Sequence, residues 1–377
     1  MSDVPHLRFP EFSGEWKKCK FGDIATGFDY GMNAAAKPFD GENKYIRITD
    51  IDEASSQYLY DDVVSPDGEL GDSYLVKEND ILLARTGAST GKSYLYRNSD
   101  GKLYFAGFLI CANIYKHNSY FVFSQLHTHR YKKWISVMSA RSGQPGINSQ
   151  EYASFPLYTT SLQEEDKIAS FLKLLDERIA TQNKIIEDLK KLKSAISKKL
   201  LCNDKWTTYK IQDIAEIGRG RVISSVEIDR QKNPLYPVYS SQTSNNGIMG
   251  YLDNYMFDGE YITWTTDGAN AGTVFYRKGK FNCTNVCGTL KIQPKFDCYF
   301  VSLVLQQATQ KYVSSNLANP KLMNNTMASI KIRMPNIETQ KQLSKVFQTL
   351  DSCLLVHQRT CKMYLSEKQY LLCQMFI

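Results

Sequence analysis

Residues 162–200 read LQEEDKIASFLKLLDERIATQNKIIEDLKKLKSAISKKL, and residues 337–375 read IETQKQLSKVFQTLDSCLLVHQRTCKMYLSEKQYLLCQM. The two stretches align without a gap. In both, apolar side chains recur at the three- and four-residue steps of a helix with one narrow apolar stripe. A helix over residues 162–200 would be about 57 Å long at 1.5 Å per residue, longer than a single small domain can cover. Such a helix needs a partner, and the second copy is the obvious one.

The apolar stripe defines a helix seam, which polar side chains interrupt at the same places in both copies. Gln182 matches His357, and Lys193 matches Lys368. We expect Gln182 and His357 to fix the register of the pair. A two-fold relation between like halves predicts antiparallel helices. An ordinary core helix, packed on its own globular portion, is the alternative. The seam residues are Ile168, Leu172, Leu175, Ile179, Gln182, Ile186, Leu189, Leu343, Phe347, Leu350, Leu354 and His357.

The repeat extends upstream into the globular portions that precede the two stretches. Residues 16–25 match residues 206–215, with Trp, Lys, Asp, Ile and Ala identical at one offset. Further along, Gly87–Gly91 matches Gly268–Gly272. The chain therefore consists of two like halves, each a globular portion followed by one long helix. The predicted boundaries are residues 1–160, 161–202, 203–335 and 336–377.

Short β-rich runs between Gly, Asp and Asn clusters predict an α+β fold with an irregular sheet in each globular portion. One helix is expected in each, entered through Ser119 and Asp297. The expected helices cover residues 120–138 and 299–314. The expected strands cover residues 44–49, 81–85, 93–97 and 103–115 in the first portion, and 235–240, 261–265, 273–277 and 288–293 in the second.

Composition places the chain among globular proteins of a reducing compartment. It has 377 residues, 42% hydrophobic and 23% charged, and no stretch reaches the roughly 18 apolar residues of a membrane helix. Nine cysteines at irregular spacings do not form a disulfide framework, which favours a cytoplasmic protein. A net charge of +7 permits a polyanionic partner without requiring one.

Two motifs suggest catalysis and are incomplete. Residues 87–93, GASTGKS, resemble a phosphate-binding loop, but Thr86 stands where the first glycine should be and a strand is expected to follow. A glycine-rich hairpin is the preferred interpretation. Residues 233–236, NPLY, resemble the motif with which amino-methyltransferases hold a flipped base, but the third position differs. In the other half, the copy of the first motif has no lysine after Gly272, and the second motif has no equivalent.

Two other clusters favour structural roles over metal binding. Cys283 and Cys287 offer two thiolates, whereas a structural zinc site needs about four ligands. His127 and His129 lie in a basic, aromatic segment, where a solvated face with Trp134 in the core is the simpler interpretation. A contact between this face and a DNA phosphate is the alternative. No convincing catalytic centre emerges.

The duplicated plan resembles the specificity subunit of type I restriction-modification enzymes over nearly the whole chain. The resemblance rests on the LRFP opening at residues 7–10, GEW at 14–16, the GDI and QDI strand starts at 22–24 and 212–214, and QEEDKIA at 163–169. It also rests on LLDERI at 174–179 and the lysine-rich run at 190–193. The second helix departs from the family pattern at Thr339–Lys341 and at Cys353 and Leu354.

The resemblance implies two target-recognition domains separated by an antiparallel coiled coil that serves as spacer. Each domain would read one half of a bipartite, asymmetric site on double-stranded DNA, and the chain itself would not be an enzyme. The helices would dock two methylation subunits that carry S-adenosylmethionine, and restriction subunits using ATP and magnesium would join them in a bacterial cytoplasm. A stand-alone DNA amino-methyltransferase or nucleotide-dependent DNA enzyme is the alternative.

Loop chemistry suggests which residues would contact DNA. Arginines and lysines near strand ends are expected to anchor phosphates without regard to sequence. Amide and hydroxyl side chains are expected to read base edges, since an amide can pair with adenine through two hydrogen bonds. The expected phosphate contacts are Arg85, Lys92, Arg97, Arg219, Arg221, Arg277, Lys278 and Lys280, and the expected base contacts are Ser240, Gln242, Asn245 and Asn246.

Overall fold

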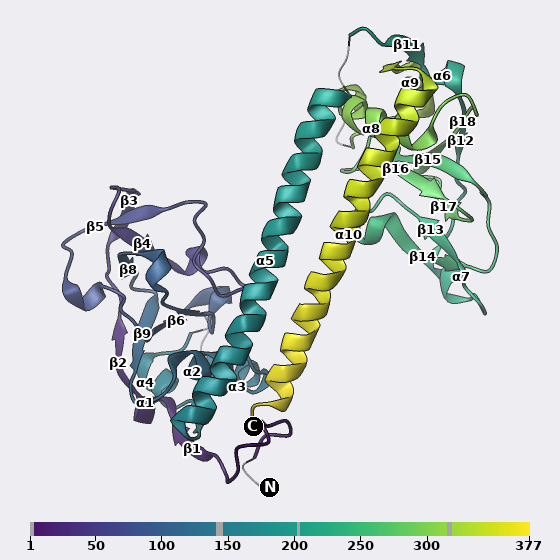
Figure 1. Cartoon of the computed structure of the whole chain (residues 1–377). Helices are drawn as coiled ribbons and strands as arrows, with labels where there is room; N and C mark the ends of the chain where they lie inside the picture. Colours follow the sequence, from purple (N-terminus) through teal and green to yellow (C-terminus); the bar gives the residue numbers. More distant parts are fainter. Residues whose placement is uncertain (1–3, 141–145, 202–203, 315–318) are drawn as a thin grey trace. The chain divides into compact units, whose positions relative to one another are not determined.

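The computed structural model describes residues 4–140, 146–201, 204–314 and 319–377 (Figure 1). The chain divides into two compact units, residues 1–183 with 359–377, and residues 184–358. The division lies inside both long helices, so each unit contains one globular portion and one segment of each long helix. The predicted boundary at residues 202 and 203 lies outside the described residues. Within the described residues, no helix is both long and apolar enough to span a membrane.

The globular portion of the first unit is built on a four-stranded antiparallel sheet in the order β2-β9-β6-β7. Smaller pairs flank it, including the parallel pair β4-β8. Its strands are β1 (Lys17–Lys20), β2 (Ala25–Tyr30), β3 (Ala35–Pro38), β4 (Lys44–Ile46), β5 (Val64–Asp67), β6 (Asp80–Ala84), β7 (Ser93–Leu95), β8 (Leu103–Phe105), β9 (Leu109–Ile114) and β10 (Pro156–Thr159). Its helices are α1 (Phe21–Ile24), α2 (Ser119–Gln125), α3 (His129–Ser139) and α4 (Ser149–Ala153).

The second unit repeats this topology with the sheet order β12-β18-β15-β16 and a parallel pair β13-β17. Its strands are β11 (Thr207–Lys210), β12 (Ala215–Arg219), β13 (Tyr236–Tyr239), β14 (Ile248–Leu252), β15 (Glu260–Thr265), β16 (Val274–Lys278), β17 (Asn282–Cys283), β18 (Cys287–Ile292) and β19 (Lys331–Met334). Its helices are α6 (Ile211–Ile214), α7 (Ser225–Asp229), α8 (Cys298–Ala308) and α9 (Asn324–Ser329). The α+β class and the internal repeat are confirmed.

Several predicted elements differ from the structure in their bounds. The helix predicted over residues 120–138 is two helices, because the Thr128 hydroxyl accepts the Tyr131 amide and starts a new helix there. Asn118, and not Ser119, caps the first of them. Asp297 caps α8 as predicted. The motifs at residues 22–24 and 212–214 form the one-turn helices α1 and α6, so describing them as strand starts was wrong.

The two long helices, α5 (Leu162–Leu200) and α10 (Ile337–Gln374), pair with each other in both units. In the first unit, Lys368 Nζ lies 2.6 Å from Asp176 Oδ1, and the Cys361 thiol donates to the Asn183 side chain at 3.3 Å. In the second unit, Lys193 pairs with Asp351. As the residue number rises along α5 it falls along α10, so the helices are antiparallel, as the two-fold relation predicted.

The lysines that interrupt the seam are explained by a contact that both units share. The Tyr120 hydroxyl from α2 donates to Asp176, the same carboxylate that pairs with Lys368. In the second unit, the Tyr299 hydroxyl from α8 donates to Asp351 Oδ2 at 2.6 Å, and Asp351 pairs with Lys193. Burial, followed by the hydrogen bond to the carboxylate, raises the pKa of Tyr299. One carboxylate in each unit thus joins a globular portion to both helices.

All the predicted seam residues are buried or half-buried, but the stripe serves more than the helix pair. Phe347 is fully enclosed in the core of the second globular portion, and Leu343 and Leu350 pack against that core. These turns of α10 therefore pack on the second globular portion as well as pairing with α5.

His127 should make the stability of the first unit depend on pH. Its Nδ1 lies 2.9 Å from the Phe123 carbonyl, which can only accept, so Nε2 accepts from the Ser56 hydroxyl at 2.9 Å. Burial, followed by the Lys368 ammonium, lowers the pKa of His127 to about 4. The pKa of His127 is thus 6.5 in the unfolded chain and about 4 in the folded chain. At pH values between these two, the unfolded chain binds more protons than the folded chain, so the free energy of unfolding must fall as the pH falls.

Chemical unfolding at pH values from 7 to 4.5 measures this dependence. The contribution of His127 should approach a slope of about 1.4 kcal/mol per pH unit, and His127→Gln should lose it. An unchanged slope in His127→Gln would show that other groups titrate.

Candidate nucleic-acid interface

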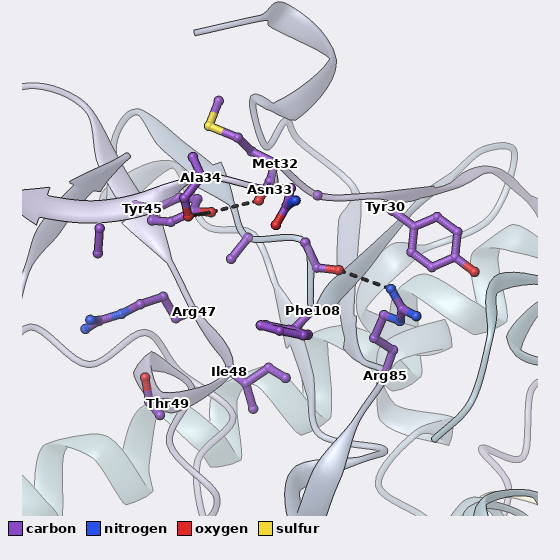
Figure 2. Close-up of a pocket in the computed structure, with 14 residues that line it drawn as sticks. Tyr30, Met32, Asn33, Ala34, Tyr45, Arg47, Ile48, Thr49, Arg85 and Phe108 are labelled. Atoms are coloured by element: carbon purple, nitrogen blue, oxygen red, sulfur yellow. Dashed lines mark hydrogen bonds between the residues drawn. The ribbon is translucent and has the colours of Figure 1, made fainter. Parts of the chain in front are cut away.

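A hollow of about 590 Å³ opens on the first globular portion, where the ends of β2, β4 and β6 meet the turn between β8 and β9 (Figure 2). Its lining mixes aromatic rings, two arginines and short polar side chains. We call it the Arg85 hollow. Its lining includes Tyr30, Met32, Asn33, Tyr45, Arg47, Ile48, Thr49, Arg85, Gly107 and Phe108.

Arg85 follows strand β6 and is held by two neighbours in this hollow. Its guanidinium carbon lies 4.6 Å from the centre of the Tyr30 ring, and Nη1 makes a long hydrogen bond of 3.5 Å to the Gly107 carbonyl. Phe108 is 64% exposed at the tip of the adjoining turn, an unusual position for so large an apolar ring. An exposed ring beside a fixed guanidinium suits a surface that contacts nucleic acid.

Arg219 ends strand β12 in the second globular portion, where neighbouring oxygens hold its exposed guanidinium. Nε donates to the Asn285 carbonyl at 2.6 Å, and Nη2 donates to the Thr266 hydroxyl at 2.9 Å. These bonds leave further N–H donors of the guanidinium for a ligand.

The other predicted phosphate contacts divide into those that form an ion pair with a carboxylate and those that form none among the described residues. Lys92 lies 3.7 Å from Glu53, Arg221 pairs with Glu227, and Lys278 lies 3.1 Å from Glu260. Arg97 is half-buried in a second hollow beside α5, and Lys280 is exposed over the Tyr255 ring at 4.4 Å. A cation already paired with a carboxylate gains less from a phosphate, so Arg97 and Lys280 are the stronger candidates of these five.

The prediction that Arg277 contacts a phosphate is wrong, because its side chain lies inside the protein. It is 3% exposed, its guanidinium carbon lies 3.6 Å from the centre of the Tyr239 ring, and its Nε donates to the Thr263 hydroxyl at 3.2 Å. Burial lowers its pKa to about 10, which leaves it charged at neutral pH. Nη2 lies 3.1 Å from the Cβ that a side chain at Gly247 would have. Arg277 therefore supports the loop of residues 240–247 from below and does not reach a phosphate.

The loop predicted to read bases splits into residues that shape it and residues that face outward. The Gln242 amide donates to the Ile248 carbonyl, and the Asn245 amide reaches the same oxygen at 3.4 Å. Asn245 and Asn246 have φ values of 48° and 53°, a left-handed conformation that Asn tolerates well. The Ser240 amide closes the loop onto the Gly247 carbonyl. Asn246, exposed at the tip, is the best placed of the four to contact a base.

The motifs that suggested other chemistry occupy structural positions. Residues 87–91 form a turn followed by strand β7, without the helix of a phosphate-binding loop. The Asn233 backbone N–H donates to the Asp253 carboxylate, and Tyr236 packs edge-on against Tyr255. Cys283 and Cys287 are buried, and burial raises the pKa of Cys287 to about 11. Among the described residues, no cluster of three His, Cys, Asp or Glu side chains could hold a metal.

Comparison with known proteins identifies the family. The model of the type I restriction modification DNA specificity domain matches residues 13–191 and again residues 203–362. The chain belongs to this family. The two matches cover both globular portions and much of both long helices, so each half of the chain is one specificity domain.

Relatives of this specificity-domain chain occur in Mycoplasma pneumoniae. One putative type I specificity subunit is 38% identical over 198 residues, which cover 52% of this chain and 82% of the relative. The specificity subunit of the type I restriction enzyme MpnII is 42% identical over 146 residues, covering 38% of this chain and 43% of the relative. These matches establish homology with type I specificity subunits.

Solved structures share the fold of both specificity domains. The crystal structure of the S subunit of a type I restriction-modification system from M. genitalium superposes with a TM-score of 0.73 at 16% identity, covering 99% of both chains. A chain from a study of complex assembly and conformational transition in the type I system superposes with a TM-score of 0.55 at 12% identity, again covering 99% of both. At these identities, the likeness concerns the fold alone.

The sequence did not predict two residues of the candidate interface. Tyr30 supports Arg85, and Phe108 projects from the turn after β8. The sequence offered a partial signal for Phe108, because it follows a glycine inside a run that was predicted to be one strand over residues 103–115. Tyr30 gave no signal, because its role depends on the pairing of β2 with β9.

Replacing Arg277 should separate a structural role from a DNA contact. Arg277→Ala removes a buried side chain and should lower the free energy of unfolding by about 3 kcal/mol. Denaturant titration measures this loss. The dependence of DNA affinity on salt should stay unchanged in the folded variant, since no phosphate contact is removed. A reduced salt dependence without a loss of stability would restore Arg277 to the DNA-contacting set.

Proposed function

We propose that this chain is the non-catalytic DNA-recognition subunit of a type I restriction-modification system, in which each specificity domain reads one half of a bipartite, asymmetric site. The duplication carries this proposal: two domains with one strand order display different loop side chains on the same frame. Two such readers suit two half-sites with different sequences. The names of the homologues as type I specificity subunits support the same conclusion.

The paired helices would serve as the spacer between the readers. Half-sites lie on one face of the duplex when they are separated by whole helical turns of about 34 Å, so their readers need a fixed separation and rotation. Salt bridges between α5 and α10, one beside each globular portion, oppose sliding of the helices. Methylation subunits that supply S-adenosylmethionine would dock on this helix pair, and restriction subunits using ATP and magnesium would join them.

Footprinting and methylation mapping of the assembled complex test the function. The full chain is purified together with the methylation subunit of its own system, and methylated adenines are mapped on a library of duplexes. We expect two short protected segments, methylated once in each and separated by unprotected base pairs. The chain without its partner should transfer no labelled methyl group. One continuous protected segment, or methyl transfer by the chain alone, would refute the proposal.

Asn246 allows the second domain to be tested separately. Asn246→Gly keeps the left-handed loop conformation but removes the amide, so base discrimination should fall by about 1–3 kcal/mol at one position of one half-site. Competition binding with duplexes changed one base pair at a time measures it. Asn233→Gly, on the same domain but outside the loop, is the control. Equal effects on both half-sites would show that Asn246 acts through the fold and does not read a base.

A further inference from the structure

The hydrogen bonds of the two sheets give a residue-by-residue correspondence between the domains. The Gly31 amide donates to the Leu109 carbonyl at 3.1 Å, and the Gly220 amide donates to the Cys287 carbonyl at 3.1 Å. At both glycines, a Cβ would lie within about 2.2 Å of a carbonyl oxygen, so both sites require glycine. The residue before each glycine is therefore equivalent: Tyr30 in the first domain matches Arg219 in the second.

A second pair of bonds aligns the ends of the central strands. The Arg85 amide donates to the Phe108 carbonyl at 3.1 Å, and the Thr266 amide donates to the Val286 carbonyl at 2.9 Å. Arg85 thus matches Thr266. The arginine therefore comes from a different strand in each domain. The first domain has tyrosine on β2 and arginine after β6, whereas the second has arginine on β12 and threonine after β15.

The exchange leaves the guanidinium at the same place. Arg85 donates to the carbonyl of Gly107, which directly precedes Phe108. Arg219 donates to the carbonyl of Asn285, which directly precedes Val286. Because Phe108 is equivalent to Val286, the carbonyls of Gly107 and Asn285 are also equivalent. A guanidinium is held against the same turn in both domains, although it comes from a different strand in each.

Both guanidinium groups are available to an anion. Within the residues that the structure describes, neither Arg85 nor Arg219 forms an ion pair with a carboxylate, in contrast to Arg47, which pairs with Asp50, and Arg221, which pairs with Glu227. Arg85 faces the open hollow of Figure 2, and Arg219 is exposed. A guanidinium presents a planar fork of N–H donors that matches the oxygens of a phosphate.

We propose that Arg85 and Arg219 are equivalent phosphate-binding residues that seat each specificity domain on the DNA backbone. The inference rests on the proposed function and adds a docking contact that the two domains share. Domains that read different half-sites cannot share a base contact at an equivalent place unless the bases coincide, whereas the phosphate backbone is the same at every sequence. Preservation of the guanidinium through a change of strand therefore indicates a contact with phosphate.

Moving the arginine between strands tests this equivalence. The full chain, purified with its methylation subunit, carries Arg85→Thr alone or together with Tyr30→Arg, which reproduces the arrangement of the second domain. Affinity for a labelled duplex containing the mapped site is measured from 50 to 300 mM salt. Arg85→Thr should weaken binding about tenfold, equally for all half-site variants, and should reduce the slope of log affinity against log salt by about 0.9. The double variant should recover both.

Two further variants serve as controls. Lys102→Thr also removes one positive charge from the first domain, at a lysine that lies 3.1 Å from Glu42. The change in DNA affinity and the change in the salt slope should each stay below about a third of the Arg85→Thr effect. Arg219→Thr should reproduce the Arg85→Thr loss in the second domain. Circular dichroism and co-purification with the methylation subunit verify that each variant is folded.

The outcomes separate this inference from the proposed function. Wild-type complex that fails to bind DNA refutes the function itself. If the wild type binds normally, the inference is overturned when Arg85→Thr behaves like Lys102→Thr, or when Tyr30→Arg fails to restore binding. A loss confined to duplexes with one particular base pair would show that the arginine reads a base, and that result also overturns the phosphate assignment.

Discussion

Two carboxylates, Asp176 on α5 and Asp351 on α10, hold the elements of each unit together. Each accepts a tyrosine hydroxyl from the adjacent globular portion and a lysine ammonium from the opposite helix. A half-buried salt bridge adds only about 1 kcal/mol of stability, but a slip of one helical turn would move the lysine about 5.4 Å away from the carboxylate. These contacts therefore contribute more to helix register than to stability, and the burial of apolar residues such as Phe347 supplies the stability.

The globular portions show how one backbone frame accommodates two readers. The strand order and the hydrogen bonds near the interface are repeated, whereas the side chains around them differ. Tyr30 and Arg85 in one domain correspond to Arg219 and Thr266 in the other, and both pairs hold a guanidinium at the same turn. Backbone geometry thus keeps the position of the charge, while strand side chains vary around it.

Charge distribution explains how a chain of modest net charge can contact DNA. The formal charge is +7, and several of the cations near strand ends already face carboxylates, as Arg221 does with Glu227. Of the predicted phosphate contacts, Arg85, Arg97, Arg219 and Lys280 are not buried and form no ion pair with a carboxylate among the described residues, so these four are the most available to an anion.

The sequence by itself determined the duplication, the long antiparallel helices and three of the four strands in each main sheet, because helical and strand periodicity depend on residues close along the chain. It did not determine which cations are available. Arg277 and Arg219 are indistinguishable as sequence, but packing against Tyr239 buries the first and leaves the second exposed. The match of Tyr30 with Arg219 was hidden by the irregularity of β2 near Phe28, which shifts the offset between the copies by one residue. Only the tertiary structure decided these points, since both depend on contacts between strands distant in the chain.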